Sequence, residues 1–133
     1  MAFVLDASVT ITWAMRDESH PLADLAALHL ETEPAVVPAI WWYEIRNMLV
    51  VNERRQRITV ADSNDFLLSL NLLNIEVVAP PQDSTALEFA RQYGLTVYDA
   101  AYLELAIRYA LPLATLDKAL RTAAEGAGVS LLA

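Results

Sequence analysis

The sequence predicts an α/β fold in which a short, mostly parallel central sheet is covered by helices on both faces. Three observations lead to this prediction. Short apolar segments recur along the 133 residues, they alternate with segments of helical periodicity, and 56% of the residues are hydrophobic, which is ample for one core. Strands that alternate with helices are typical of parallel sheets buried on both faces. We expect residues 1–133 to form a single domain, because no repeat or linker interrupts the pattern.

Five short apolar segments are expected to be strands, since each is bounded by turn-forming or charged residues. They are Phe3–Leu5, Ala35–Val37, Ile75–Val78, Leu113–Thr115 and Ser130–Leu132. The carboxyl ends of parallel strands share one edge of a sheet, and ligands bind at that edge in folds of this class. Functional residues are therefore expected directly after these segments.

Helices are expected between the strands, with ends marked by residues that cap or break a helix. We expect Ser8 to cap a brief helix that reaches Trp13, Thr59 to cap a later helix, and Asp83 to cap one that stops at Gly94. The other expected helices run from Pro21 to about Thr32, from Ile40 to about Arg55, from Asp99 to before Pro112, and from about Asp117 to Glu125.

Composition excludes several classes of protein. The net charge of −8 argues against a protein that coats nucleic acid, which would be basic. The chain has no cysteine, so disulfides, thiolate metal sites and a cysteine nucleophile are excluded. The amino-terminal residues do not resemble a signal peptide, and no apolar run is long enough to span a membrane. We expect a soluble, cytoplasmic protein with no membrane partner.

Four acidic residues are the candidate site. Asp6 directly follows the first expected strand, and Asp117 lies just past the Leu113–Thr115 strand. Glu44 is in the first turns of the helix after the second strand, and Asp99 is at a helix start. The expected topology can place all four at one edge of the sheet. Two carboxylates at roughly 4 Å repel by about 4 kcal/mol at an effective dielectric of 20, so such a cluster requires a cation.

Mg²⁺ or Mn²⁺ suits a site made only of carboxylates. A cation held there can bind a phosphodiester, activate a water and neutralise the leaving oxygen. Each acid also has a simpler interpretation. Asp6 could form a turn, Glu44 could be a solvated helix residue, and Asp99 and Asp117 could be helix caps. The joint placement of the four favours a functional site.

Four segments together resemble PIN-domain proteins, specifically the VapC-type toxin ribonucleases. The first segment is Val4-Leu5-Asp6-Ala7-Ser8, and the second contains Pro38, Trp42, Glu44 and Asn47. The third is Tyr98-Asp99-Ala100-Ala101-Tyr102-Leu103-Glu104-Leu105-Ala106, and the fourth is Leu113-Ala114-Thr115-Leu116-Asp117. The order and spacing of all four segments are specific to the family, and they span the whole chain.

The resemblance implies a three-layer α/β/α sandwich and an endoribonuclease that depends on Mg²⁺ or Mn²⁺. The metal-binding acids of the family correspond to Asp6, Glu44, Asp99 and Asp117. The family's small hydroxyl residue corresponds to Thr115, its helix asparagine to Asn47, and Ser8 is a further supporting residue. The resemblance also implies a homodimer and a cognate small VapB-type antitoxin that blocks the site.

Basic and aromatic residues add further candidates. Arg46, Arg54, Arg55 and Arg57 fall within twelve positions. They are either a solvated helix end, whose negative dipole they complement, or a patch that binds the RNA backbone. Trp13 and Met15 are expected to be exposed and offered to a partner. The two histidines, His20 and His29, lack zinc-ligand spacing and are expected to be structural.

Two alternative functions remain open. A PIN nuclease could process RNA routinely without an antitoxin, and a neighbouring gene for a small antitoxin would discriminate between the two. A receiver-like signalling module also has an acidic Mg²⁺ pocket, but it needs adjacent early acids and a separate late lysine. Here Asp6 has no acidic neighbour, and the only lysine, Lys118, directly follows an acid.

Overall fold

A computed structural model describes all of residues 1–133. Its central sheet has four parallel strands in the order β3-β2-β1-β4. The strands are β1 (Phe3–Leu5), β2 (Ala35–Pro38), β3 (Ile75–Val78) and β4 (Leu113–Ala114). The inner strands β1 and β2 are buried at every position, whereas β3 is a half-exposed edge strand. The order of the strands brings the first and last thirds of the chain side by side at β1 and β4.

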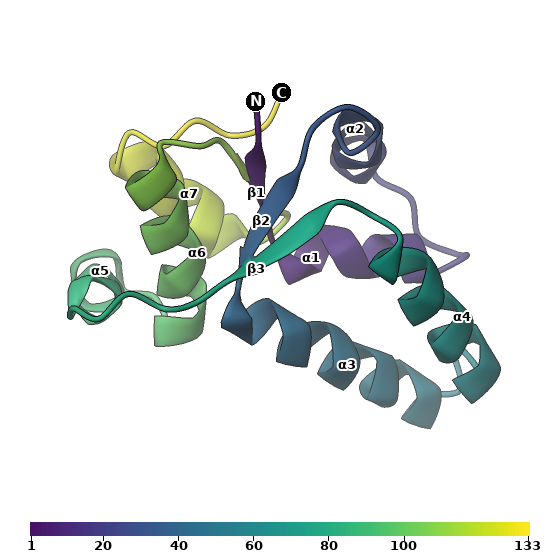
Figure 1. The fold of residues 1–133 in the computed structure, drawn as a ribbon. Coiled ribbons are helices and arrows are strands. Elements are labelled where there is room, and N and C mark those ends of the chain that lie inside the picture. The colour runs from purple at the N-terminus through teal and green to yellow at the C-terminus, as the bar shows by residue number, and fades with distance from the viewer.

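Helices lie on both sides of the sheet, so the fold is the predicted α/β/α sandwich (Figure 1). On one side lie α5 (Thr85–Tyr93), α6 (Val97–Tyr109) and α7 (Lys118–Gly126). On the other side lie α1 (Ala7–Thr10), the 3₁₀ helix η1 (Ile11–Ala14), α2 (Pro21–His29), α3 (Ala39–Arg54) and α4 (Val60–Asn71). None of these helices is long and apolar enough to cross a membrane.

The core is one cluster of buried apolar side chains from the strands and from the faces of α3, α6 and α7. Phe3, Leu5, Ile45, Leu103 and Leu120 are all fully buried within it. Helix α6 packs against β1, β2 and β4, which explains why its middle turns are almost entirely buried. The core therefore fixes α3 and α6, the two helices that begin at the carboxyl edge of the sheet, relative to β1.

The sequence-based boundaries are correct to within a few residues, but one expected strand and the expected cap of the first helix are wrong. Ser130–Leu132 is not a strand; it contributes a single parallel bridge between Leu113 and Leu131. The first helix begins one residue before Ser8, with Asp6 at its cap position. The Ser8 hydroxyl does not cap the helix, because it donates a hydrogen bond to the Asp6 side chain instead.

Candidate functional site

Asp6 is the most buried of the four predicted acids, since only 5% of the residue is exposed. It directly follows β1, and the Ser8 and Thr115 hydroxyls each donate a hydrogen bond of 2.6 Å to its Oδ2 atom. Thr115 reaches Asp6 because β1 pairs with β4 in a register that opposes Leu5 and Ala114. Two hydroxyl donors compensate for part of the cost of burying a carboxylate.

The same hydroxyls also organise the segment that leads into α7. The backbone N–H of Leu116 donates to Ser8 Oγ at 2.9 Å, and that of Asp117 donates to Thr115 Oγ1 at 3.0 Å. Arg121 Nη1 donates to the Thr115 carbonyl at 2.9 Å. Asp117 is therefore attached to the Asp6 end of the sheet through short hydrogen bonds.

Glu44 projects from the second turn of α3 and is half-buried. Tyr102 of α6 donates a hydrogen bond of 2.6 Å from its hydroxyl to Glu44 Oε1. Helix α3 is also fixed to the first helix by Trp41, whose indole N–H donates to Thr10 Oγ1 at 3.0 Å, and Thr10 in turn donates to the Asp6 carbonyl. These contacts bring Glu44 to the same edge of the sheet as Asp6.

Of the other two acids, Asp117 caps a helix and Asp99 does not. Asp99 lies in the first turn of α6, but the cap is Thr96, whose Oγ1 accepts a hydrogen bond of 3.1 Å from the Asp99 N–H. A capping role therefore does not explain the Asp99 carboxylate. Asp117 does cap α7, because its Oδ1 accepts from the Leu120 N–H at 2.9 Å.

The four carboxylates are close enough to influence one another's charge. Burial raises the pKa of Asp6, and the negative charge of Asp117 adds to the rise. Burial raises the pKa of Glu44 to about 7, with further contributions from Asp6 and Asp99. The pKa of Asp99 is raised by burial and then by Asp117 and Asp6. Three of the four predicted acids thus have a raised pKa to which the charge of another of the four contributes, and the surrounding hydroxyls offset only part of the rise at Asp6 and Glu44.

The chemistry of these donors fits a hard divalent cation. No three histidine or acidic side chains have the spacing of a preformed metal cage. All donors at the edge are oxygens, as Mg²⁺ and Mn²⁺ prefer, and the negative charges would be drawn together by a cation. Neither histidine belongs to the group, since His20 caps α2 and His29 is paired with Glu33. By the chemistry of their donor atoms alone, Asp6, Glu44, Asp99 and Asp117 are the candidate ligands at this edge.

The predicted supporting residues have different surroundings. Ser8 and Thr115 contact Asp6 directly, whereas Asn47 is exposed one turn after Glu44 on α3. Tyr102 was not assigned a role from the sequence, although it lies three positions after Asp99 and so on the same face of a helix. That spacing could have identified it.

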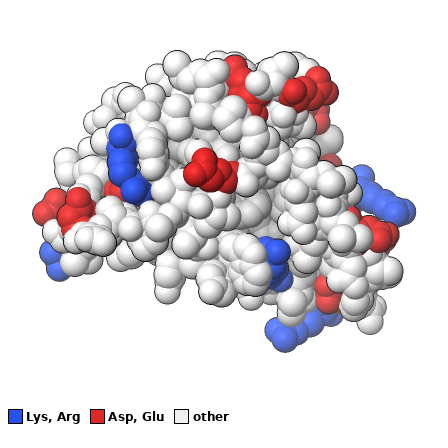
Figure 2. Space-filling model, in the orientation of Figure 1, with Lys and Arg blue, Asp and Glu red and all other residues white.

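The predicted arginines do not form one surface. Arg46 stacks over the Trp42 ring, 3.6 Å from its centroid, one helical turn from that residue and two positions after Glu44. Arg57 is engaged with Asp17 and Glu18 in ion pairs of 3.2 and 3.0 Å. Arg54 and Arg55 are exposed at the end of α3, about 15 Å along the helix from Glu44. Basic side chains on the face in Figure 2 are scattered rather than continuous.

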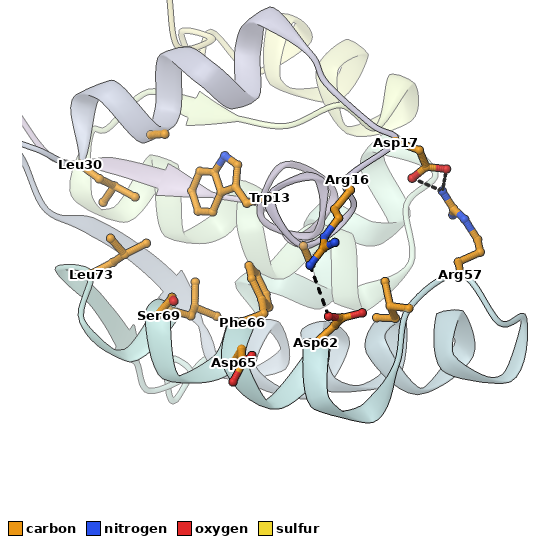
Figure 3. A pocket seen from close by; sticks show the side chains of 14 residues that line it. Trp13, Arg16, Asp17, Leu30, Arg57, Asp62, Asp65, Phe66, Ser69 and Leu73 are labelled. Carbon is orange, nitrogen blue, oxygen red and sulfur yellow. Dashed lines mark hydrogen bonds and ion pairs between the residues drawn. The ribbon is translucent and has the colours of Figure 1, made fainter.

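The prediction that Trp13 and Met15 are exposed is wrong for Met15, which is 4% exposed. Trp13 is partly buried, because its indole N–H donates to the Ala23 carbonyl at 3.0 Å. Its ring borders a groove of about 780 Å³ (Figure 3). The groove lies between η1, α2 and α4, and none of the four acids lines it. This groove is thus separate from the four predicted acids.

The raised pKa of Glu44 generates a prediction about the metal-free protein. The folded state binds the Glu44 proton more tightly than the unfolded state does, so stability from this group is complete below about pH 4.5 and is lost as the pH rises through about 7. As the pH rises, Glu44 should lower the free energy of unfolding of the parent by about 1–2 kcal/mol, after allowing for solvent screening of a half-buried group. Glu44→Gln should not show this decrease. Urea unfolding between pH 4.5 and 8 measures the free energy of unfolding of both proteins. Glu53→Gln, on the same helix, is the control, and an identical pH profile for the parent and Glu44→Gln would contradict the prediction.

Comparisons with known proteins agree with the fold. Among curated proteins, none matches the chain significantly. Among solved structures, the crystal structure of PAE2754 from Pyrobaculum aerophilum is 27% identical with a TM-score of 0.71, over 92% of this chain and 87% of that chain. A structure of a toxin-antitoxin complex from Klebsiella pneumoniae is 19% identical with a TM-score of 0.56, over 84% of this chain and 82% of that one, and this likeness concerns the fold alone. The family model of the PIN domain matches residues 3–126, so the chain belongs to the PIN domain family, whose members are generally nucleases.

Proposed function

We propose that this chain is a metal-dependent endoribonuclease and the toxin of a VapBC-type toxin-antitoxin pair. One observation supports the nuclease assignment: in a chain of the PIN family, Asp6, Glu44 and Asp99 each have a pKa raised by burial and by the charge of another of the four predicted acids. An arrangement that raises the pKa of several acids destabilises the metal-free fold and is typical of functional sites. No histidine or cysteine offers an alternative catalytic group there.

Each acid has a role in the proposed reaction. Asp6, fixed by two hydroxyls, is the most rigid ligand for Mg²⁺ or Mn²⁺, and Glu44 and Asp99 complete the charge that attracts the cation. Asp117 contributes charge while its Oδ1 holds the start of α7. The bound cation would supply a positive charge for the phosphodiester and for an attacking water. Among the four predicted arginines, we propose that Arg46 contacts RNA, because it is the nearest to Glu44 in the sequence and, unlike Arg57, is not engaged in an ion pair.

A nuclease of routine RNA processing is the alternative. It shares the chemistry and differs only in lacking an antitoxin, so binding of the neighbouring gene's product distinguishes the two. The receiver-like module does not agree with the family match.

The carboxylate cluster is tested by Asp99→Asn, which keeps the shape of the side chain and removes one charge. We expect the metal-free variant to be as stable as the parent or more stable by about 1 kcal/mol, because repulsion is relieved. Cleavage of total RNA with Mg²⁺ or Mn²⁺ should fall by more than about 100-fold, and the thermal stabilisation by added metal should shrink.

The matched control is Asp65→Asn, an exposed acid on α4 that should change neither the cleavage nor the metal response. RNA cleavage that persists in chelator would overturn the mechanism. Full activity in Asp99→Asn would overturn the assignment of the site.

We propose that the groove beside Trp13 receives a helix or strand of the antitoxin. The structure from Klebsiella pneumoniae with the same fold is a toxin-antitoxin complex, which motivates a partner of this kind. Leu30, Phe66 and Leu73 supply apolar walls, while the Arg16–Asp62 and Arg57–Asp17 pairs lie at one end (Figure 3). Such a groove suits an amphipathic segment. We further propose a homodimer, for which the exposed Tyr43 and Tyr98, which precede Glu44 and Asp99 in the sequence, provide apolar surface.

Ser69→Arg tests the antitoxin proposal by filling the groove with a long side chain. The neighbouring gene's product should bind the parent and inhibit it, and its affinity for Ser69→Arg should fall at least tenfold, as measured by calorimetry. Leu68→Arg, at an exposed position that does not line the groove, is the control and should bind normally. Equal affinity for both variants would place the antitoxin elsewhere, and no binding to the parent would favour the routine processing nuclease.

A further inference from the structure

The Glu44 carboxylate is hydrogen-bonded to Tyr102, a residue of another helix that has no role in the proposed reaction. Tyr102 is 0% exposed, and its hydroxyl donates to Glu44 Oε1 at 2.6 Å. The two residues are 58 positions apart and belong to helices on different sides of the sheet. The hydrogen bond therefore joins α3 to α6 at the edge where the acids gather.

The surroundings of the Tyr102 hydroxyl make this contact specific. A buried phenol requires a hydrogen-bond partner, and the Glu44 carboxylate is the acceptor that this hydroxyl uses. Asp6 is also near, since its negative charge acts on Tyr102. The hydroxyl therefore lies close to two of the four acids and donates its proton to one of them.

A glutamate on a helix surface needs such a contact to be held in place. Its side chain has three rotatable bonds, and fixing them costs conformational entropy. Asp6 is shorter and already receives two hydroxyl hydrogen bonds, from Ser8 and Thr115. Glu44 receives its side-chain hydrogen bond from Tyr102 alone. Carboxylates that bind metals are commonly oriented by hydrogen bonds from residues outside the ligand set.

We propose that Tyr102 is a positioning residue that orients Glu44 for a divalent cation, rather than only a core residue of α6. This inference rests on the proposed function, because it takes Glu44 as a metal ligand. Removing the hydroxyl frees the Glu44 side chain to adopt other rotamers, so the cation would meet a mobile ligand instead of a fixed one.

The test measures Mn²⁺ binding to the metal-free chain by calorimetry for four proteins: the parent, Tyr102→Phe, Glu44→Gln and the double variant. We expect Tyr102→Phe to weaken Mn²⁺ binding at least about tenfold, and to recover RNA cleavage as Mn²⁺ is raised. In the Glu44→Gln background, the same change should have little further effect, because the ligand that Tyr102 orients is already lost. Tyr109→Phe, at an exposed position of the same helix, should bind Mn²⁺ like the parent.

The positioning role of Tyr102 and the proposed metal-dependent function can fail separately. A parent that binds no Mn²⁺ overturns both. A parent that binds Mn²⁺ while Tyr102→Phe binds equally well, or is weakened to the same extent with and without Glu44, overturns the role of Tyr102 alone. A second measurement does not depend on the folding of any variant: side-chain NMR relaxation of the parent should show Glu44 more rigid than Glu53, and an equally mobile Glu44 overturns the proposal.

Discussion

The burial of the Asp6 carboxylate is the constraint on which the rest of the site depends. An acid that is 5% exposed at the end of a core strand needs hydrogen-bond donors, and the fold provides them from two directions, Ser8 in the first helix and Thr115 after β4. The parallel pairing of β1 with β4 is what makes the second donor available. The same hydroxyls accept backbone N–H groups of Leu116 and Asp117, so one buried charge organises both ends of the chain at a single edge of the sheet.

The repulsion between the carboxylates and the proposed binding of a cation both arise from the way the helices pack against the sheet. Core packing of α3 and α6 against the sheet brings Glu44 and Asp99 toward Asp6, and burial with mutual repulsion raises the pKa of all three. The packing of the core offsets the free energy of this repulsion, as is common where a functional site destabilises the folded state. A divalent cation would convert the repulsion into attraction, so the affinity for metal and the instability of the empty site have the same origin. Hydroxyl donors hold the side chains of Asp6 and Glu44 in place, each through its own partners.

Sequence patterns predicted the fold class correctly, because strand and helix periodicity are local features, and the position of acids after strands, also a local feature, is the basis for predicting the four site residues. Contacts between residues that are far apart in the sequence were harder to predict. Met15 reads as exposed from its charged neighbours Arg16 and Asp17, but it is buried. Thr96, not Asp99, caps α6, a difference of three positions that frees the Asp99 carboxylate. The bond between Tyr102 and Glu44 depends on the approach of α3 and α6, which no local pattern encodes.

The central claim is that the four carboxylates form one cation site created by the fold. Anomalous diffraction from crystals grown with Mn²⁺ tests it most directly, because the scattering of manganese locates the ion independently of activity. If the four carboxylates bind one cation, the peak lies at the carboxyl edge of the sheet, with carboxylate oxygens of Asp6 and at least one of Glu44 and Asp99 at about 2.0–2.3 Å. A fully occupied peak elsewhere on the molecule, with the carboxylates still apart, would contradict it.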